Sequence, residues 1–249
     1  LLSGLGYTSY LVFRNSMVKQ FSVYLLGLGL FFHTVTISLR SIDTGHGPYT
    51  TGFEIASFLA WVIVVIYFFI EFKYKIKDLG AFVIPVVFLI LLFSSFQSRE
   101  FSLIDESTTM FWLTMHRTLS IIGYAAFAIA FGAAVMYLIQ ENQVKTKKLG
   151  VMYFRMPSLE VLDNLNYKVI SIGFPLFTLG FMTGSIWNIK TDESFAWDPI
   201  RTLPLIVVWL VYCSIFFGRL LVGWRGKKAA QGAILGFVSV IVSYFFHVV

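Results

Sequence analysis

The chain has 249 residues, of which 57% are hydrophobic and 13% are charged, and its mean hydropathy is +0.79. Soluble domains usually contain about 25% charged residues, so this composition excludes a soluble enzyme or binding domain and indicates a polytopic membrane protein. The net charge of +6 is attributed to loop orientation, because the basic residues form no patch typical of nucleic-acid binding, and the lone Cys213 excludes an internal disulfide framework.

The N-terminal stretch differs from the rest of the chain. We interpret Leu1 to Phe13, LLSGLGYTSYLVF, as the end of a preceding helix, followed by a cytoplasmic segment to residue 20. This stretch has neither the charged n-region nor the cleavage site of a signal peptide. Because the chain begins without methionine and stops inside an apolar run, we expect it to be a piece of a longer protein.

Apolar runs of roughly twenty residues predict about seven transmembrane helices. Their approximate ranges are 21–39, 52–71, 80–96, 111–140, 167–187, 203–222 and 230–249. The fourth run is longer than the hydrocarbon core requires, so we expect this helix to extend beyond the bilayer. The sequence therefore predicts an all-α, polytopic helical bundle, with residues 21–249 forming a single membrane domain.

Basic residues are unequally divided between the loops on the two sides of these spans. Five of the 19 basic residues fall on one side, namely Arg40, Arg99, Arg117, Lys190 and Arg201, which leaves 14 on the other. By the positive-inside rule, the side with 14 is cytoplasmic. Glu54, on the external side, is either a partner for a helix dipole or an ion-pair partner of Arg40.

A polar, aromatic loop at about 185–201 separates the fifth and sixth spans, and this orientation places it outside. The loop carries Trp187, Phe195, Trp197 and Asp198, which form an aromatic platform beside a carboxylate. Two plainer interpretations remain open. Tryptophans at an interface are often belt residues, and Asp followed by Pro is typical of a helix start.

All four histidines fall on the external side as well. A histidine inside a span is costly and is a functional hypothesis by default, and two imidazoles from different helices can hold one haem iron. His116 and His247, near the outer ends of the fourth and seventh spans, are the candidate iron ligands. His33 is a candidate buried ligand, whereas His46 in GHGPYTTG is interpreted as a turn former. The alternative for each is a bond to a helix carbonyl or to water.

Several motifs together carry a resemblance to a known family. They include MHRTLSIIGYAAFAIAFGAAVMYL from Met115, PSLEVLDNLNYKVISIGFPLFTLGFMTGSIW from Pro157, the WDP of Trp197 to Pro199, and GWRGKKAA from Gly223. The chain resembles the CcsA (ResC) family of System II cytochrome c biogenesis, as a divergent member or a fragment. These haem-handling membrane proteins belong to a superfamily named for a tryptophan-rich external loop, the WWD loop.

The resemblance implies that haem b is held at the external loop and delivered to apocytochrome c, where its vinyl groups form thioethers with a Cys-X-X-Cys-His motif. It implies the bacterial cytoplasmic membrane or an equivalent, and a CcsB (ResB)-like partner or a missing part of the same chain. An enzyme of this kind is part of a holocytochrome c synthase and contributes positioning and shielding. The implied haem-binding residues are His116, His247, Trp187, Phe195, Trp197, Asp198 and His33.

The chain departs from the family pattern at several positions, including Leu203, where an aromatic residue is common, and three others that bear on haem binding. Phe195 replaces a tryptophan, Phe217 stands where the family tends to have a histidine, and His247 precedes the usual place of the second ligand. An alternative function is therefore a divergent relative without synthase activity, acting as a haem b-binding or structural membrane subunit of a respiratory or electron-transfer complex. A transporter of another small molecule is a third interpretation, but no inverted repeat or pair of broken helices appears in the sequence.

Overall fold

The computed structural model describes the whole chain except residues 77, 101–107, 148–149, 151–152, 192–198 and 249, and except the side chains at 108–109, 199–201 and 245–248. The described residues form helices only. These are α1 (Leu2–Phe13), α2 (Ser16–Thr44), α3 (Gly52–Tyr74), α4 (Gly80–Ser95), α5 (Thr108–Thr146), α6 (Leu159–Thr191), α7 (Pro199–Leu221) and α8 (Lys227–Val248).

Helices α2 to α8 coincide with the seven predicted spans, which confirms a polytopic helical membrane protein. Five of them, α2, α3, α5, α6 and α7, are long and apolar enough to cross a membrane, whereas α4 is apolar but shorter. The 39 residues of α5 correspond to about 58 Å of helix, compared with about 30 Å for a hydrocarbon core. The prediction that this helix is longer than the bilayer is therefore confirmed.

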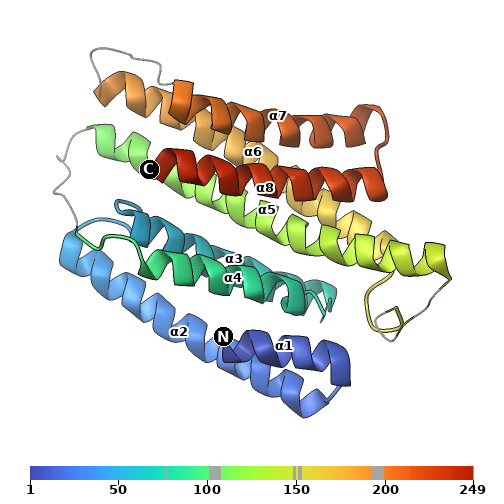
Figure 1. The fold of residues 1–249 in the computed structure, drawn as a ribbon. Helices are drawn as coiled ribbons and strands as arrows, with labels where there is room; N and C mark the ends of the chain where they lie inside the picture. Colours follow the sequence, from blue (N-terminus) through green and yellow to red (C-terminus); the bar gives the residue numbers. More distant parts are fainter. Residues whose placement is uncertain (77, 101–107, 148–149, 151–152, 192–198, 249) are drawn as a thin grey trace.

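The helices run approximately parallel or antiparallel to one another, so the bundle has two distinct ends (Figure 1). We call the end at which α5 and α7 begin and α6 and α8 end the histidine end, because it holds His46 and His116. The opposite end, which holds Lys19 and Arg219, is called the basic end. Helix α5 lies centrally and packs against α3, α4, α6 and α8. Short α1 packs on α2 and α4 toward the basic end.

Glycines allow α5 and α6 to approach closely. A Cβ added to Gly173 on α6 would lie 2.6 Å from the Cβ of Ala126, and one added to Gly123 on α5 would lie 2.8 Å from the Cβ of Phe177. Apolar side chains gain little from leaving lipid, so small residues that permit close backbone packing are a main source of helix association in membranes. The α5–α6 pair therefore forms the most intimate contact of the bundle.

At the basic end, the buried carboxylate of Glu71 joins three helices. Its oxygens accept hydrogen bonds from the hydroxyls of Tyr7 at 3.0 Å and Tyr67 at 2.6 Å, and they form an ion pair with Lys19 at 2.9 Å. A charge removed from water is tolerated only with such partners. This cluster ties α1 and α2 to α3.

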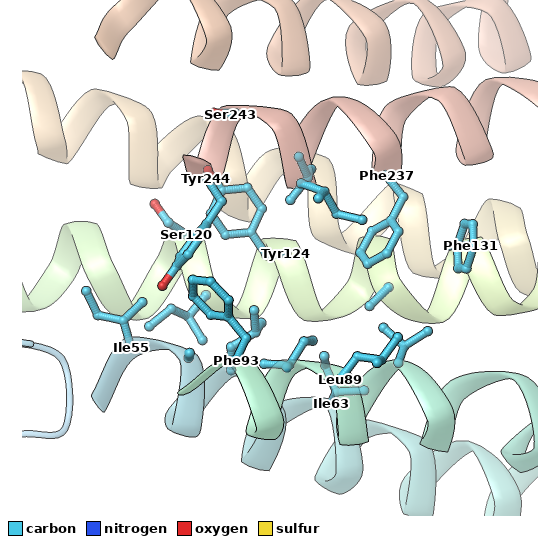
Figure 2. Close-up of a pocket in the computed structure, with 18 of the residues that line it drawn as sticks. Ile55, Ile63, Leu89, Phe93, Ser120, Tyr124, Phe131, Phe237, Ser243 and Tyr244 are labelled. Carbon is cyan, nitrogen blue, oxygen red and sulfur yellow. The ribbon is translucent and has the colours of Figure 1, made fainter. Parts of the chain in front are cut away.

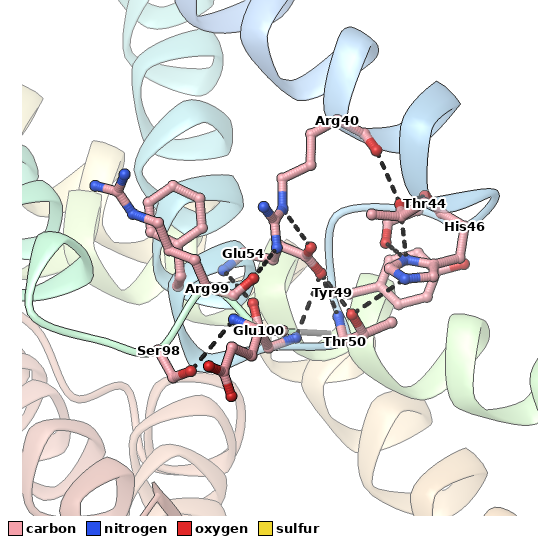
Figure 3. A network of polar contacts seen from close by, with 12 residues as sticks. Arg40, Thr44, His46, Tyr49, Thr50, Glu54, Ser98, Arg99 and Glu100 are labelled. Carbon is pink, nitrogen blue, oxygen red and sulfur yellow. Dashed lines mark hydrogen bonds and ion pairs between the residues drawn. The ribbon is translucent and has the colours of Figure 1, made fainter. Parts of the chain in front are cut away.

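At the histidine end, Glu54 has the same role (Figure 3). Its side chain is 1% exposed, accepts a 2.6 Å hydrogen bond from Arg40 Nε, and accepts two further bonds from the amide and hydroxyl of Thr50. With Thr51 it also forms a capping box at the start of α3. The two predicted roles of Glu54, helix-start partner and ion-pair partner of Arg40, are therefore both confirmed.

We expect Glu54→Ala to lower the free energy of unfolding by about 3–5 kcal/mol, because it leaves the Arg40 guanidinium without its carboxylate and removes half of the capping box. The matched control is Glu141→Ala on α5, which breaks an ion pair with Lys145 whose lysine is 60% exposed and should cost about 0.3–0.5 kcal/mol. Equilibrium unfolding in mixed detergent micelles measures both values. Equal losses would contradict the organising role of Glu54.

Candidate functional site

His116 lies on α5, two turns from the start of the helix, and faces α6. Its Nδ1 lies 2.7 Å from the carbonyl oxygen of Gly180. A carbonyl oxygen only accepts hydrogen bonds, so Nδ1 carries the proton and donates it. In the neutral ring this places the lone pair on Nε2, the nitrogen that such a histidine offers to a metal.

The space for the His116 ring is made by Gly184, one turn further along α6. A Cβ on Gly184 would lie 2.5 Å from Nδ1 and 2.7 Å from Cε1 of the imidazole. A Cβ on Gly180 would in turn overlap the hydroxyl of Ser120. The two glycines form a small-xxx-small pair that lets a neighbouring backbone approach. The spacing of the two glycines in GFMTG is the feature of the sequence that indicates a close helix contact here. The residue that occupies this space, His116, was not predicted.

Trp187 is the only member of the predicted aromatic platform among the described residues. It lies one turn beyond Gly184 on α6, is partly buried, and its carbonyl accepts a 3.0 Å hydrogen bond from the Thr191 hydroxyl. Helix α6 continues to Thr191, so the first part of the predicted loop is helical. Phe195, Trp197 and Asp198 lie outside the described residues.

The structure gives His33 and His46 partners of their own. His33 on α2 forms a 2.8 Å hydrogen bond through Nε2 with the hydroxyl of Ser57 on α3. His46 uses Nδ1 to bond the carbonyl of Gly47 at 2.9 Å, within the turn before α3. Position 247 lies on α8 at the histidine end, but its side chain is outside the described residues. His116 therefore contacts α6, the helix that carries Trp187, whereas His33 belongs to the α2–α3 contact.

A cavity of about 520 Å³ lies beside His116, bordered mainly by α3, α4, α5 and α8 (Figure 2). Almost all of its lining is aliphatic or aromatic. The polar exceptions gather toward the histidine end and include His116, Arg117, Ser120, Ser243 and Tyr244. Such a size and such a lining are typical of small-molecule sites. The composition of the sequence indicated no cavity, because its lining residues belong to five separate apolar runs.

Arg117 follows His116 on α5 and links the cavity to the turn before α3. Its guanidinium donates a hydrogen bond to the carbonyl of Tyr49, whose hydroxyl is 2.7 Å from the hydroxyl of Thr114. The turn is thereby held against the start of α5. In the sequence Arg117 counts only as one of the five basic residues of the external side, whereas in the structure it lies within α5 and lines the cavity.

Comparison with known proteins assigns the chain to a family. Residues 50–249, about four-fifths of the chain, match the model of the cytochrome c assembly protein family. The chain belongs to this family. It is 30% identical to a cytochrome c biogenesis protein CcsA of Guillardia theta, with 98% of this chain and 88% of the relative covered. It is 31% identical to the CcsA protein of Chlorella vulgaris, with 85% and 77% covered. The resemblance seen in the motifs is confirmed.

In this cytochrome c assembly protein, position 217 offers no ligand atom. Phe217 on α7 is 45% exposed and packs edge-on against Phe216, with ring centroids 5.2 Å apart. Nearby Arg219 forms a 2.7 Å ion pair with Asp163 and covers the ring of Tyr167 at 4.8 Å. The arginine before the GWRG turn therefore joins α7 to α6, and the side chains around it serve packing.

Proposed function

We propose that this cytochrome c assembly protein binds haem b at the histidine end of its bundle and presents it for covalent attachment to apocytochrome c. Membership of the family supports a role in cytochrome c biogenesis. The observation that carries the finer proposal is the fixed orientation of His116, whose Nδ1–H bonds the Gly180 carbonyl.

This hydrogen bond is the kind that metal-ligating histidines usually make. A ligating imidazole commonly donates its second N–H to a carbonyl or carboxylate, which fixes the tautomer and the ring orientation and raises the basicity of the ligating nitrogen. His116 has this arrangement before any ligand is considered. The glycine at 184 removes the one Cβ that would displace the ring. The geometry therefore fits an axial ligand to haem iron.

His247 would provide the second ligand to the iron. Ser243 and Tyr244 on α8 border the same cavity as His116, so the last turns of α8 and the start of α5 lie at one place in the bundle. Position 247 is about 4.5 Å further along the α8 axis than Tyr244. Two ligands from two separate helices would hold the iron at a defined depth in the membrane.

The aromatic loop completes the proposed site. Trp187, Phe195 and Trp197 would stack on the macrocycle, and Asp198 would order the loop as a helix cap. His33, bonded to Ser57, would contribute to a separate inner site. The histidine end would face the outside of the membrane, with a CcsB (ResB)-like partner or another part of the chain covering the loop. Bound haem supplies the vinyl groups for thioether formation, whereas this chain binds it, orients it and excludes water.

The alternative proposal is a haem b-binding or structural subunit of an electron-transfer complex. The phenylalanines at 195 and 217 favour it, because each takes the place of a residue that the resemblance associates with haem. Both proposals predict a histidine-ligated haem at His116 when haem is bound. They differ in whether that haem leaves the protein, so co-expression with an apocytochrome c and measurement of covalent haem on it separates them.

We expect His116→Ala to weaken or abolish the sharp reduced-haem absorption of the purified protein, because it removes one axial ligand, and we expect added imidazole to restore part of it. The optical spectrum after dithionite reduction, normalised to protein, measures the effect. His46→Ala is the control, since that ring bonds its own turn and should leave the spectrum unchanged. Wild-type protein from haem-replete cells that contains no haem would contradict the proposal.

We expect Gly184→Ala to lower haem affinity by about tenfold or more, the scale seen when a partner of a ligand is disturbed, because the added Cβ pushes the His116 ring from its place. Gly29→Ala on α2 is the matched control, since no atom lies within 4 Å of the Cβ it would add. Haem titration of both variants gives the comparison. Unchanged affinity in Gly184→Ala would show that the orientation of His116 does not matter.

A further inference from the structure

The cavity beside His116 is elongated along the helix axes and graded in polarity. On α5 its lining extends from His116 to Phe131, and on α3 from Ile55 to Ile63, distances of about 22 Å and 12 Å along the two helices. At its deep end the rings of Phe131 and Phe237 stack with centroids 4.8 Å apart. Figure 2 shows Ser120 and Tyr244 at the opposite end from these two rings.

Arg117 introduces a positive charge at the polar end of this cavity. Its hydrogen-bond partner is a neutral carbonyl, that of Tyr49. The nearby carboxylate of Glu54 is already paired with Arg40 at 2.6 Å, and within the ranges that the structure describes no carboxylate forms an ion pair with Arg117. A charge at the edge of an apolar space is strongly stabilised by a counter-ion. This end of the cavity therefore favours an anion.

Tyr244 provides a second, independent sign of a ligand. Its hydroxyl is buried and has no hydrogen-bond partner among the described residues, and its ring lines the cavity and meets Phe93 edge-on at 5.5 Å. A buried hydroxyl without a partner is unfavourable, because it has lost its hydrogen bonds to water. An acceptor oxygen in the cavity would restore a hydrogen bond, and an anionic oxygen would form the strongest one.

Leu89 on α4 and Ile241 on α8 both line the cavity, and they are 60% and 45% exposed. We infer from this that the cavity opens between α4 and α8. Apolar side chains on the outside of membrane helices contact lipid tails. The opening therefore leads into the bilayer, and a molecule that enters through it comes from the membrane.

We propose that this cavity binds one anionic amphiphile from the bilayer, with its carboxylate or phosphate at Arg117 and Tyr244 and its apolar chain directed toward Phe131 and Phe237. Along this length the lining is almost entirely apolar, and its charged and unpaired polar groups lie at one end. This polarity matches a flexible apolar chain that carries one charged head group. The proposed anchors are Arg117 and Tyr244, and the proposed iron ligand His116 lines the same end of the cavity, so the two sites adjoin each other.

The test is native mass spectrometry of the full chain released from nanodiscs of equal parts phosphatidylglycerol and phosphatidylcholine. We expect wild type to retain one phosphatidylglycerol in preference to phosphatidylcholine. Arg117→Gln should reduce this retention by about tenfold, the scale of one lost charged hydrogen bond, and Arg117→Lys should keep most of it. A parallel titration with oleate shows whether a carboxylate or a phosphate is the better head group.

Arg99→Gln is the matched control, because Arg99 lies at the same end over the ring of Phe53, at 5.0 Å, and does not line the cavity. Its lipid retention should equal that of wild type. Should Arg117→Gln fail to fold in a thermal-shift assay, Tyr244→Phe takes its place, since it removes only a hydroxyl and should weaken retention several-fold.

Three outcomes would overturn the proposal. The first is that wild type retains the two lipids equally, and the second is that Arg117→Gln and Tyr244→Phe both retain the lipid as wild type does. The third is that wild type binds no lipid while Arg117→Gln loses its haem absorption, which would make the cavity part of the haem site. Gly184→Ala separates the two proposals, because Gly184 contacts the His116 ring and does not line the cavity. It should weaken haem binding and keep the lipid, whereas Arg117→Gln should lose the lipid and keep haem.

Discussion

The contact between α5 and α6 is the interaction on which the rest of the histidine end depends. Glycines at 123, 173, 180 and 184 remove the side chains that would hold the two backbones apart. Only at that separation can the imidazole of His116 reach the carbonyl of Gly180 at 2.7 Å. The close packing of α5 against α6 therefore also fixes the tautomer of His116 and the orientation of its ring.

Carboxylates hold the remaining helices around this pair. Glu54 joins α2 to the start of α3, and Glu71 joins α1 and α2 to α3 near its other end. In lipid, a buried charge without partners would be expelled, so each carboxylate specifies which side chains surround it. Asp163 does the same for α6, α7 and the turn before α8, through Arg219 and the amide of Gly226. Polar contacts set the arrangement, and apolar packing supplies the bulk of the contact area.

The helices were predictable because a bilayer demands about twenty apolar residues for each span, and those runs are visible in the sequence. The capping box of Thr51 and Glu54 is local, so it too was within reach of sequence reasoning. By contrast, the sequence did not predict that Gly184 contacts His116, that a cavity is present, or where Arg117 lies. Helical periodicity identifies a face but not the helix that covers it, and the cavity is assembled from residues nearly 190 positions apart, from Ile55 to Tyr244. The described residues test the predicted aromatic loop only at Trp187.

His116 and Arg117 are consecutive residues on one helix, with one held against α6 and the other at the edge of the cavity. Consecutive residues of a helix point about 100° apart, so a small rotation of α5 moves both side chains at once. Binding at the two residues would then be linked. If lipid in the cavity changes the affinity of the His116 imidazole for iron by some factor, iron on the imidazole must change the affinity of the cavity for the lipid by the same factor. The amount of iron bound at His116 would thus depend on the lipid composition of the surrounding membrane.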